Sequence, residues 1–167
     1  DWFGKRTKAV PVTYVGLEGQ AGLRNRVYAY RKAHGNVGQM LMITDSLNIS
    51  KAEDQQRLLR AMTRNNQMGG ILVIDTMSKS NPSYIKAIED LARQTYGVVL
   101  LVHHSGKDGD KGPRGHSSFI AALDAAIEVN KVPDSPNRVW RTKKVKDGAD
   151  DVEELFSLEG IEIGVDQ

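Results

Sequence analysis

Apolar residues occur along this chain in short continuous runs, and longer segments with helical spacing separate the runs. Each run is too short for a helix and is bounded by glycine or polar residues, which favours a strand buried in a sheet. The intervening segments place apolar residues three or four positions apart, as helices do. Strands that alternate with helices predict a parallel sheet. The predicted strands are 12–17, 40–44, 71–74 and 98–102, and the predicted helices are 20–34, 51–66 and 82–96.

The C-terminal part of the chain extends this pattern and then changes it. A short helix at 117–123 and a strand at 125–129 continue the alternation. Residues 138–144 and 154–158 then alternate polar and apolar around a turn signal at 146–148, which predicts an antiparallel hairpin on the sheet edge. The predicted fold class is therefore α/β, with a mostly parallel sheet, helices on both faces, right-handed crossovers and a C-terminal antiparallel hairpin.

Length and composition indicate the number of domains and the cellular compartment that we expect for this protein. With 167 residues, 40% of them hydrophobic and 26% charged, the chain fits a single globular domain over residues 1–167. It has no cysteine, which excludes disulfides and thiolate metal sites and favours an intracellular, cytoplasmic protein. No apolar run approaches the ~20 residues of a membrane span, and no signal peptide opens the sequence, so we expect no membrane partner.

Charge is more informative in its distribution than in its total. The formal net charge of +2 is too small to indicate nucleic-acid binding by itself, but basic residues cluster at 5–8, 107–114 and 138–146. The middle cluster lies in a glycine-rich polar stretch, SGKDGDKGPRGHSS, which predicts a loop. Basic clusters of this kind are compatible with phosphate binding. Lysines on a hairpin are also a common protection of a sheet edge against aggregation, and without further information that interpretation is preferred.

Three predicted strands end in residues that can carry chemistry: Glu18, Asp75 and the pair His103-His104. The carboxyl ends of parallel strands share one edge of a sheet, where open α/β sheets bind their ligands. A carboxylate that positions water, a carboxylate that holds magnesium and a histidine that senses phosphate form a coherent set for phosphoanhydride hydrolysis. The sequence therefore predicts a phosphate-directed site at this edge.

Structural roles compete with each of these assignments. Asp75 can cap the turn that follows it, and Glu18 can interact with the dipole of the next helix at a typical ~0.3–1 kcal/mol. Consecutive histidines on a strand point to opposite faces, and this pair lacks a second ligand pair at helical spacing. A buried, hydrogen-bonded histidine is therefore favoured over a metal ligand. On the residues alone, these alternatives stay open.

Several segments in a fixed order carry a family resemblance. They are VTYVGLEGQAGLRNRVYAYRKAHG, ILVIDT, VVLLVHHSGKDGDKGPRGHSS, LDAAIEV and KKVKDG. Together they resemble the RecA-like ATPase domain of the RepA-type replicative helicases and their phage and plasmid relatives, a group of AAA_25-like P-loop NTPases. The resemblance covers nearly the whole chain. It implies a DNA helicase or DNA-stimulated ATPase that uses ATP and Mg²⁺.

The resemblance also implies roles at the strand ends. Glu18 corresponds to the catalytic carboxylate that polarises the attacking water. Asp75 resembles the Walker B acid that holds Mg²⁺ through water, and Thr76 beside it belongs to the same nucleotide site. His103 or His104 corresponds to the sensor that links the γ-phosphate to the DNA-binding loops, and the residues do not decide which.

The family further implies partners. Lys107, Lys111 and Arg114 resemble the loop that faces the channel of a ring and contacts single-stranded DNA, and Ser117 and Ser118 complete the family's RG-x-SS pattern. In related hexameric ring helicases, a basic pair on the edge hairpin reaches the neighbouring subunit's nucleotide site, and Lys144 and Lys146 are at that place. Lysine there, where an arginine is common, leaves the strength of this activation in trans open. A primase is a partner that the family leaves open.

One family motif does not occur in these residues. The P-loop, GxxxxGK[ST], is expected upstream of the DWFG segment, and without its lysine and backbone N–H groups this chain should bind nucleotide weakly or not at all. Two other functional classes therefore stay open. One is a non-catalytic assembly or DNA-binding module that keeps the fold, and the other is a recombinase-like or circadian-type RecA relative.

Overall fold

The computed structural model describes residues 2–36, 38–76, 82–104, 117–148 and 152–164. The chain forms two compact units, Lys8–Gly115 with Glu162–Gln167, and His116–Ile161 with Asp1–Thr7. The prediction of one RecA-like domain over residues 1–167 stays a prediction. Among the helices in the described ranges, none has the length and apolar character to cross a membrane.

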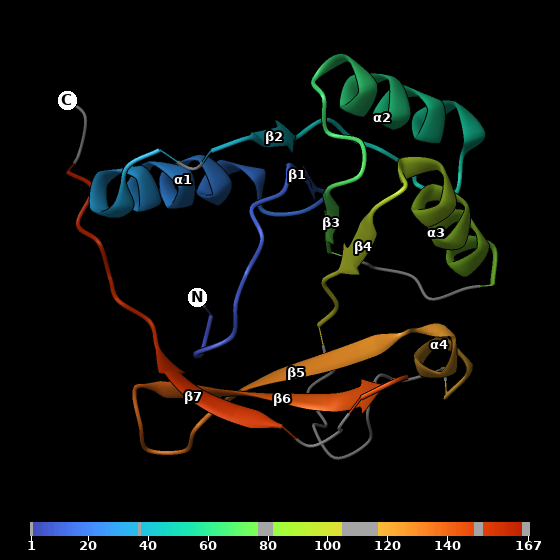
Figure 1. Cartoon of the computed structure of the whole chain (residues 1–167). Helices are drawn as coiled ribbons and strands as arrows, with labels where there is room; N and C mark the ends of the chain where they lie inside the picture. Colours follow the sequence, from blue (N-terminus) through green and yellow to red (C-terminus); the bar gives the residue numbers. More distant parts are fainter. Residues whose placement is uncertain (1, 37, 77–81, 105–116, 149–151, 165–167) are drawn as a thin grey trace. The chain divides into compact units, whose positions relative to one another are not determined.

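The larger unit contains a four-stranded sheet in which all neighbouring strands are parallel. Figure 1 shows this sheet nearly edge-on, with α1 on one face and α2 and α3 on the other. The α/β fold class with helices on both faces is therefore confirmed. In order across the sheet, the strands are β2 (Met40–Ile43), β1 (Val12–Gly16), β3 (Ile71–Asp75) and β4 (Val98–Leu101). The helices are α1 (Gln20–His34), α2 (Ala52–Arg64) and α3 (Pro82–Thr95).

The two central strands of this sheet supply its core. Val15 of β1 and Ile74 of β3 have no exposed surface, because helices cover both faces of these strands. Leu58 of α2 and Leu91 of α3 are buried with them. The continuous apolar runs seen in the sequence are the pattern that a doubly covered sheet requires.

Two glycines allow the backbone of this sheet to pack closely where the strands begin. A Cβ atom on Gly70 would lie 2.1 Å from the carbonyl oxygen of Pro11, and one on Gly97 would lie 2.1 Å from the carbonyl oxygen of Gly70. Real Cβ atoms do not approach so closely. The Ile71 N–H donates to the same Pro11 oxygen at 2.9 Å, so β3 enters the sheet at a point where a side chain has no room.

The start of α2 is fixed by a carboxylate inside the helix. The backbone N–H of Asn48 donates to Asp54 Oδ2 at 2.9 Å, and Arg57 donates to Asp54 Oδ1 at 3.1 Å. The Asn48 N–H is the main cause that lowers the pKa of Asp54, and Arg57 adds to it. Asp54 thus ties the preceding loop to the first turn of the helix.

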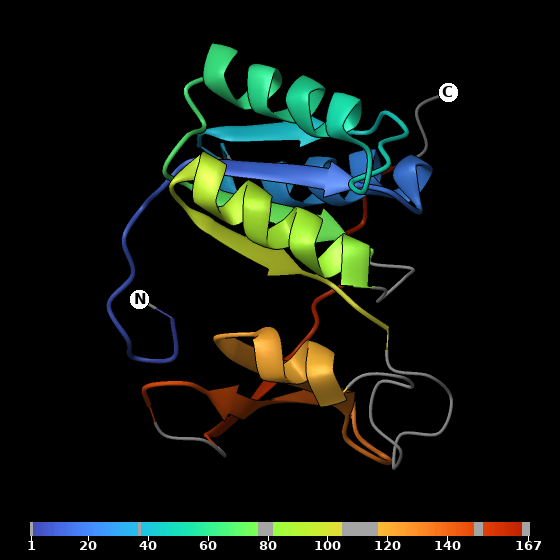
Figure 2. The same ribbon diagram turned by 90° about the vertical axis from the view of Figure 1, so that its right-hand side faces the viewer.

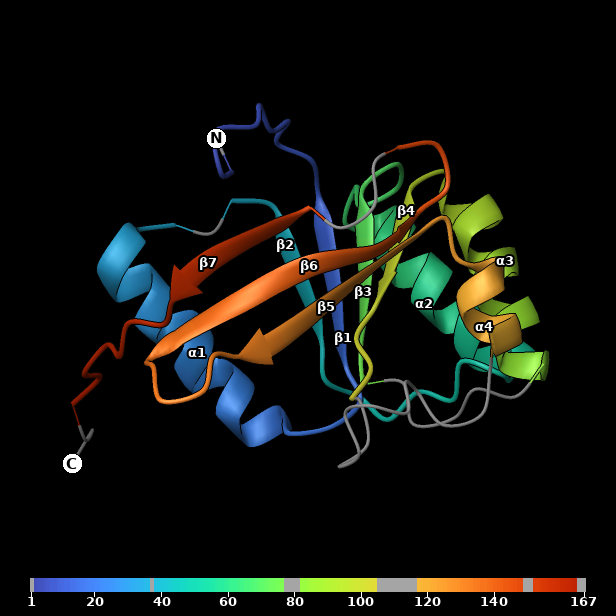
Figure 3. The ribbon, with the colours of Figure 1, turned by 90° about the horizontal axis from the view of Figure 1, so that it is seen from below.

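The smaller unit contains α4 (Ser117–Ala122) and a three-stranded antiparallel sheet of β5 (Ala125–Lys131), β6 (Asn137–Val145) and β7 (Glu153–Ser157). Figure 3 shows the three strands side by side. The hairpin of β6 and β7 is confirmed. The prediction that residues 125–129 continue the parallel sheet, with the hairpin on its edge, is wrong, because β5 pairs with β6 in a separate sheet.

The physical reason lies in the exposure of β5. Ile127 and Val129 are 56% and 57% exposed, whereas residues of the central parallel strands are buried on both faces. A strand with an open face suits an antiparallel sheet. The core of this unit contains a cluster of aromatic rings. Trp140 of β6 is buried and stacks on Trp2, with the two ring centroids 4.8 Å apart. Phe3 contacts the Trp140 ring edge-on.

Candidate functional site

Strand register brings the ends of β1 and β3 to the same level. Gly16 is the partner of Asp75, and the Leu17 N–H donates to the Asp75 carbonyl at 2.6 Å. Ile74 is the partner of Leu101 of β4. Figure 2 shows these strands running in one direction. Residues that follow the three strands therefore share the carboxyl edge of the sheet, as the sequence predicts.

Both oxygens of the Asp75 carboxylate accept a hydrogen bond. The Thr76 hydroxyl donates to Oδ1 at 2.8 Å, and the Tyr14 hydroxyl, from β1, donates to Oδ2. Asp75 itself is half-buried, and Thr76 is buried. The carboxylate is therefore held by one neighbour in sequence and one from the adjacent strand. The turn that Asp75 was alternatively expected to cap, residues 77–81, lies outside the described residues.

Tyr14 keeps its proton in this environment. Burial raises the pKa of the Tyr14 hydroxyl to about 12, with a further contribution from its hydrogen bond to Asp75, and Arg26 opposes the shift. Sequence reasoning gave Tyr14 no role. Alternation along each strand assigns Tyr14 and Asp75 to a face of their own strand. The register between β1 and β3 is needed to show that the two side chains meet.

Both histidines after β4 are exposed, so the expectation of a buried histidine is wrong, and His104 reaches this group. Its Nε2 lies 3.5 Å from the Thr76 hydroxyl oxygen. Because Thr76 gives its proton to Asp75, its oxygen is free to accept from His104 in the tautomer that carries the proton on Nε2. The structure thus joins Tyr14, Asp75, Thr76 and His104 at one edge. No cluster of three or more metal-ligating side chains exists within the described ranges.

Glu18 lies at the same edge, just beyond β1. It is exposed and directly precedes Gly19, the left-handed N-cap residue of α1. This position suits either hypothesis for Glu18, a carboxylate that orients water at the sheet edge or a charge that favours the start of α1.

The basic residues assigned to DNA and to a neighbouring subunit fall in different places. Lys107, Lys111 and Arg114 lie outside the described residues, and Ser117 and Ser118 begin α4, with side chains that are likewise not described. Their assignments stay predictions.

Lys144 and Lys146 make local contacts at the end of α4. Lys144 Nζ donates to the carbonyl oxygens of Ile120 and Ala121 at 3.0 and 2.8 Å, and Lys146 Nζ lies 3.4 Å from Asp124 Oδ1. A lysine that binds the last carbonyls of a helix is a common C-terminal cap. In this structure the ammonium group of Lys144 therefore stabilises α4, and its role toward a neighbouring subunit stays a prediction.

The interpretation of the basic hairpin as a protected sheet edge is wrong for β6. This strand is the centre of its sheet, and two of its basic residues, Arg141 and Lys143, pair with acids on the neighbouring strands. Arg141 Nε donates to Glu153 of β7 at 2.9 Å, and Lys143 lies 3.2 Å from Glu128 of β5.

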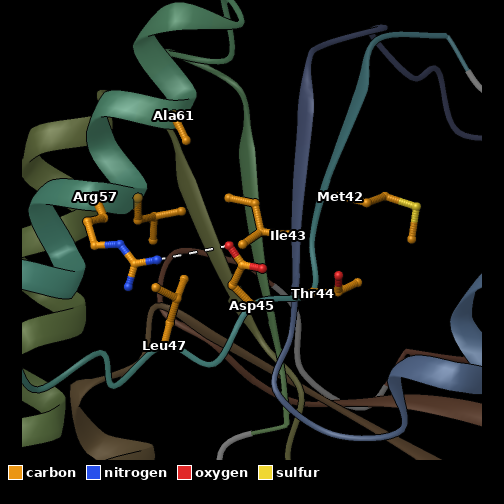
Figure 4. Close-up of a pocket in the computed structure, with 8 residues that line it drawn as sticks. Met42, Ile43, Thr44, Asp45, Leu47, Arg57 and Ala61 are labelled. Atoms are coloured by element: carbon orange, nitrogen blue, oxygen red, sulfur yellow. Dashed lines mark ion pairs between the residues drawn. The ribbon is translucent and has the colours of Figure 1, made fainter.

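Two of the hollows among the described residues of the larger unit are lined by residues other than Asp75. The first, shown in Figure 4, has a volume of about 220 Å³ and lies between β2 and α2, with Asp45 and Arg57 4.0 Å apart at its side. It is smaller than the ~300 Å³ at which ligand pockets begin. The second, of about 660 Å³, lies along α1 and includes Arg24 and Arg31. Neither contains a residue of the Asp75 group.

Comparison with known proteins agrees with this architecture. Residues 1–110 match the family AAA_25, an AAA domain. No curated protein matches the sequence. The crystal structure of the RadB recombinase superposes with a TM-score of 0.60 at 13% identity, over 90% of this chain and 76% of that chain, and at this identity the likeness concerns the fold alone. The chain therefore belongs to the AAA_25 family of AAA domains and has a RecA-like α/β fold.

Proposed function

We propose that this chain is the ATP-hydrolysing core of a RepA-type DNA helicase or DNA-stimulated ATPase. The observation that supports this function is the Asp75 carboxylate at the carboxyl edge of the parallel sheet, with a donor on each oxygen and His104 linked to it through Thr76. Ligands of open α/β sheets bind at this edge, and an acid there holds the metal of nucleotide-hydrolysing P-loop proteins.

The donor set fits magnesium. Mg²⁺ prefers oxygen ligands, keeps several of its waters and is usually bound through one or two carboxylates. Each Asp75 oxygen has two acceptor sites and uses one of them, so each can accept from a metal-bound water. Asp75 would thus hold Mg²⁺ through water, and the bound ion would neutralise charge on the phosphates.

The phosphate cradle has to come from outside these 167 residues, because no GxxxxGK[ST] segment occurs within them. The proposed activity is therefore that of the polypeptide that contains both this chain and a P-loop. In that protein Glu18 would orient the attacking water, and His104 would transmit the state of the phosphate through Thr76 to Asp75.

DNA and subunit contacts complete the proposal. Lys107, Lys111 and Arg114 would contact single-stranded DNA inside a hexameric ring. Lys144 and Lys146 would face the nucleotide site of the next subunit, in which case Lys144 exchanges its contacts with α4 for a phosphate. The likeness to RadB adds nothing to the choice between unwinding and recombination.

The deciding experiment compares Glu18→Gln with Glu89→Gln, an exposed acid on α3, in the full-length protein. Loss of the group that orients water should lower the rate of ATP hydrolysis about 100-fold or more, while ATP binding persists. The Glu89 variant should hydrolyse ATP at the parent rate. Retained turnover in Glu18→Gln would remove Glu18 from the proposed role.

DNA contact is tested by the salt dependence of single-strand affinity. Substitution of Lys111 and Arg114 by alanine should reduce the slope of log affinity against log salt by about 1 to 2, since each phosphate contact contributes somewhat less than one unit. Alanine at Arg60 and Lys86, which are exposed on α2 and α3, provides the control. An unchanged slope in the first variant would reject the loop as a DNA contact.

A second candidate function rests on the absence of a P-loop from these residues. We infer that a non-catalytic assembly or DNA-binding module is the alternative. It predicts that the full-length protein oligomerises or binds DNA without hydrolysing ATP, which sedimentation together with an ATPase assay would establish.

A further inference from the structure

Tyr14 reaches Asp75 because of where the two residues lie in neighbouring strands. Tyr14 of β1 is the partner of Val73 of β3, and residues paired in this way point to the same face of a sheet. Asp75 is two residues beyond Val73, so its side chain returns to that face, one step closer to the carboxyl edge. The length of a tyrosine side chain spans this step, and its hydroxyl donates to Asp75 Oδ2.

The surroundings of Tyr14 hold the ring in this position. Its neighbours in sequence, Thr13 and Val15, are fully buried on the opposite face. Gly16 lies beside the ring, because a Cβ atom there would be 3.8 Å from Tyr14 Cε1, an ordinary van der Waals contact distance. The hydroxyl is therefore directed along the sheet toward the strand end.

Tyr14 and Thr76 together fix the orientation of the Asp75 carboxylate and leave acceptor sites on its oxygens. Thr76 donates to Oδ1 and Tyr14 to Oδ2, so the plane of the carboxylate is set by two donors on different oxygens. A Thr76 hydroxyl alone would leave the group free to turn about its bond to Cβ. The donor from a second strand prevents this rotation, and each oxygen keeps an acceptor site.

We propose that Tyr14 is a positioning residue that orients the Asp75 carboxylate for a divalent cation. This inference rests on the proposed function, which assigns the cation to Asp75. Loss of a group that hydrogen-bonds a metal-binding carboxylate typically lowers metal affinity by about 10- to 100-fold. Because the cation here is held through water, the lower end of this range is expected.

The test measures the affinity of Mn²⁺, a spectroscopic substitute for Mg²⁺, for the full-length protein with a non-hydrolysable ATP analogue. Free Mn²⁺ is followed by electron paramagnetic resonance. Tyr14→Phe removes only the hydroxyl, and Tyr84→Phe, at a buried tyrosine on α3, is the matched control. Asp75→Asn measures the full contribution of the carboxylate.

We expect Asp75→Asn to weaken Mn²⁺ binding most, Tyr14→Phe to weaken it about tenfold, and Tyr84→Phe to leave it within about a factor of two. If Asp75→Asn weakens binding and Tyr14→Phe does not, Tyr14 has no positioning role and the proposed function stands. Equal losses in both tyrosine variants would show a packing effect and overturn the inference. If Asp75→Asn binds Mn²⁺ normally, the metal role of Asp75 fails, and the inference fails with it.

Discussion

The parallel and the antiparallel sheet of this protein use their polar residues in opposite ways. In the parallel sheet β1, β3 and β4 carry no charged residue before their carboxyl ends, where Glu18, Asp75 and the histidine pair lie. In the antiparallel sheet, charges lie along the strands and pair with charges directly across or beside them. Charges that are paired within a sheet are already neutralised. The polar groups at the strand ends are oriented but retain capacity for a ligand.

The same contrast holds for what keeps each sheet together. Residues of the parallel sheet pack against helices on both faces, and its backbone approaches closely at Gly70. The antiparallel sheet depends on Trp140 and the rings stacked on it. Mutations should therefore affect the two sheets through different mechanisms.

The largest effect is expected from Gly70→Ala in the parallel sheet. Because the new Cβ would lie 2.1 Å from a backbone oxygen, β1 and β3 cannot keep their spacing, and the free energy of unfolding should fall by roughly 4 kcal/mol or more. Gly22→Ala is the control, since this exposed position in α1 has room for a methyl group and should gain about 0.5–1 kcal/mol. Urea unfolding measures the free energy of unfolding of both variants. Equal changes in the two would contradict the close approach of Gly70 to the Pro11 backbone.

The aromatic cluster of the antiparallel sheet should give the next largest effect. Trp140→Ala leaves a cavity under Trp2 and should cost about 3–5 kcal/mol. Tyr96→Ala removes an aromatic ring that is 84% exposed and should cost far less. If both variants unfold at the same urea concentration, the antiparallel sheet does not depend on Trp140.

A smaller effect is expected from the cross-strand pair Arg141–Glu153. A double-mutant cycle with Arg141→Gln and Glu153→Gln should give a coupling energy of about 0.2–1 kcal/mol that decreases with added salt, because both side chains are partly exposed. A coupling of zero at low salt would show that the charges are not neutralised by this pairing, and would weaken the contrast between the sheets.

The smallest effect concerns Asp54, the acid that joins the loop to α2. Its pKa is lowered in the folded protein, so its contribution to stability is present above its unfolded pKa and is lost as pH falls toward and below that value. The stability of Asp54→Asn should therefore depend less on pH than that of the parent between about pH 5 and pH 2. If stability depends on pH equally in the two proteins, Asp54 does not contribute to the pH dependence.

Much of the parallel sheet was predictable because its strands carry a distinct signal. The run Ile71–Ile74 was predicted as a strand, and the structure adds only Asp75. Hydrophobic periodicity finds such elements because a doubly covered strand consists mostly of apolar residues. The same signal located Asp75 at a strand end.

The remaining features depend on which strands pair, and periodicity does not contain this information. Residues 125–129 suit a parallel or an antiparallel strand, and only the pairing with β6 decides. The hydrogen bond from Tyr14 to Asp75 joins residues 61 positions apart, so it follows from the register of β1 and β3. The contacts of Lys144 with α4 likewise join elements whose packing the sequence does not specify.

The central claim, that the carboxyl edge at Asp75 is the metal and nucleotide site, is tested most directly by the rate of Mg²⁺-dependent ATP hydrolysis in two variants of the full-length protein. Asp75→Asn and Asp45→Asn both remove one acid at the carboxyl end of a parallel strand of the same sheet, but Asp45 pairs with Arg57 beside a separate small hollow. We predict a loss of about 100-fold or more for Asp75→Asn and less than about twofold for Asp45→Asn. Equal rates in the two variants, or full activity in Asp75→Asn, would contradict the account.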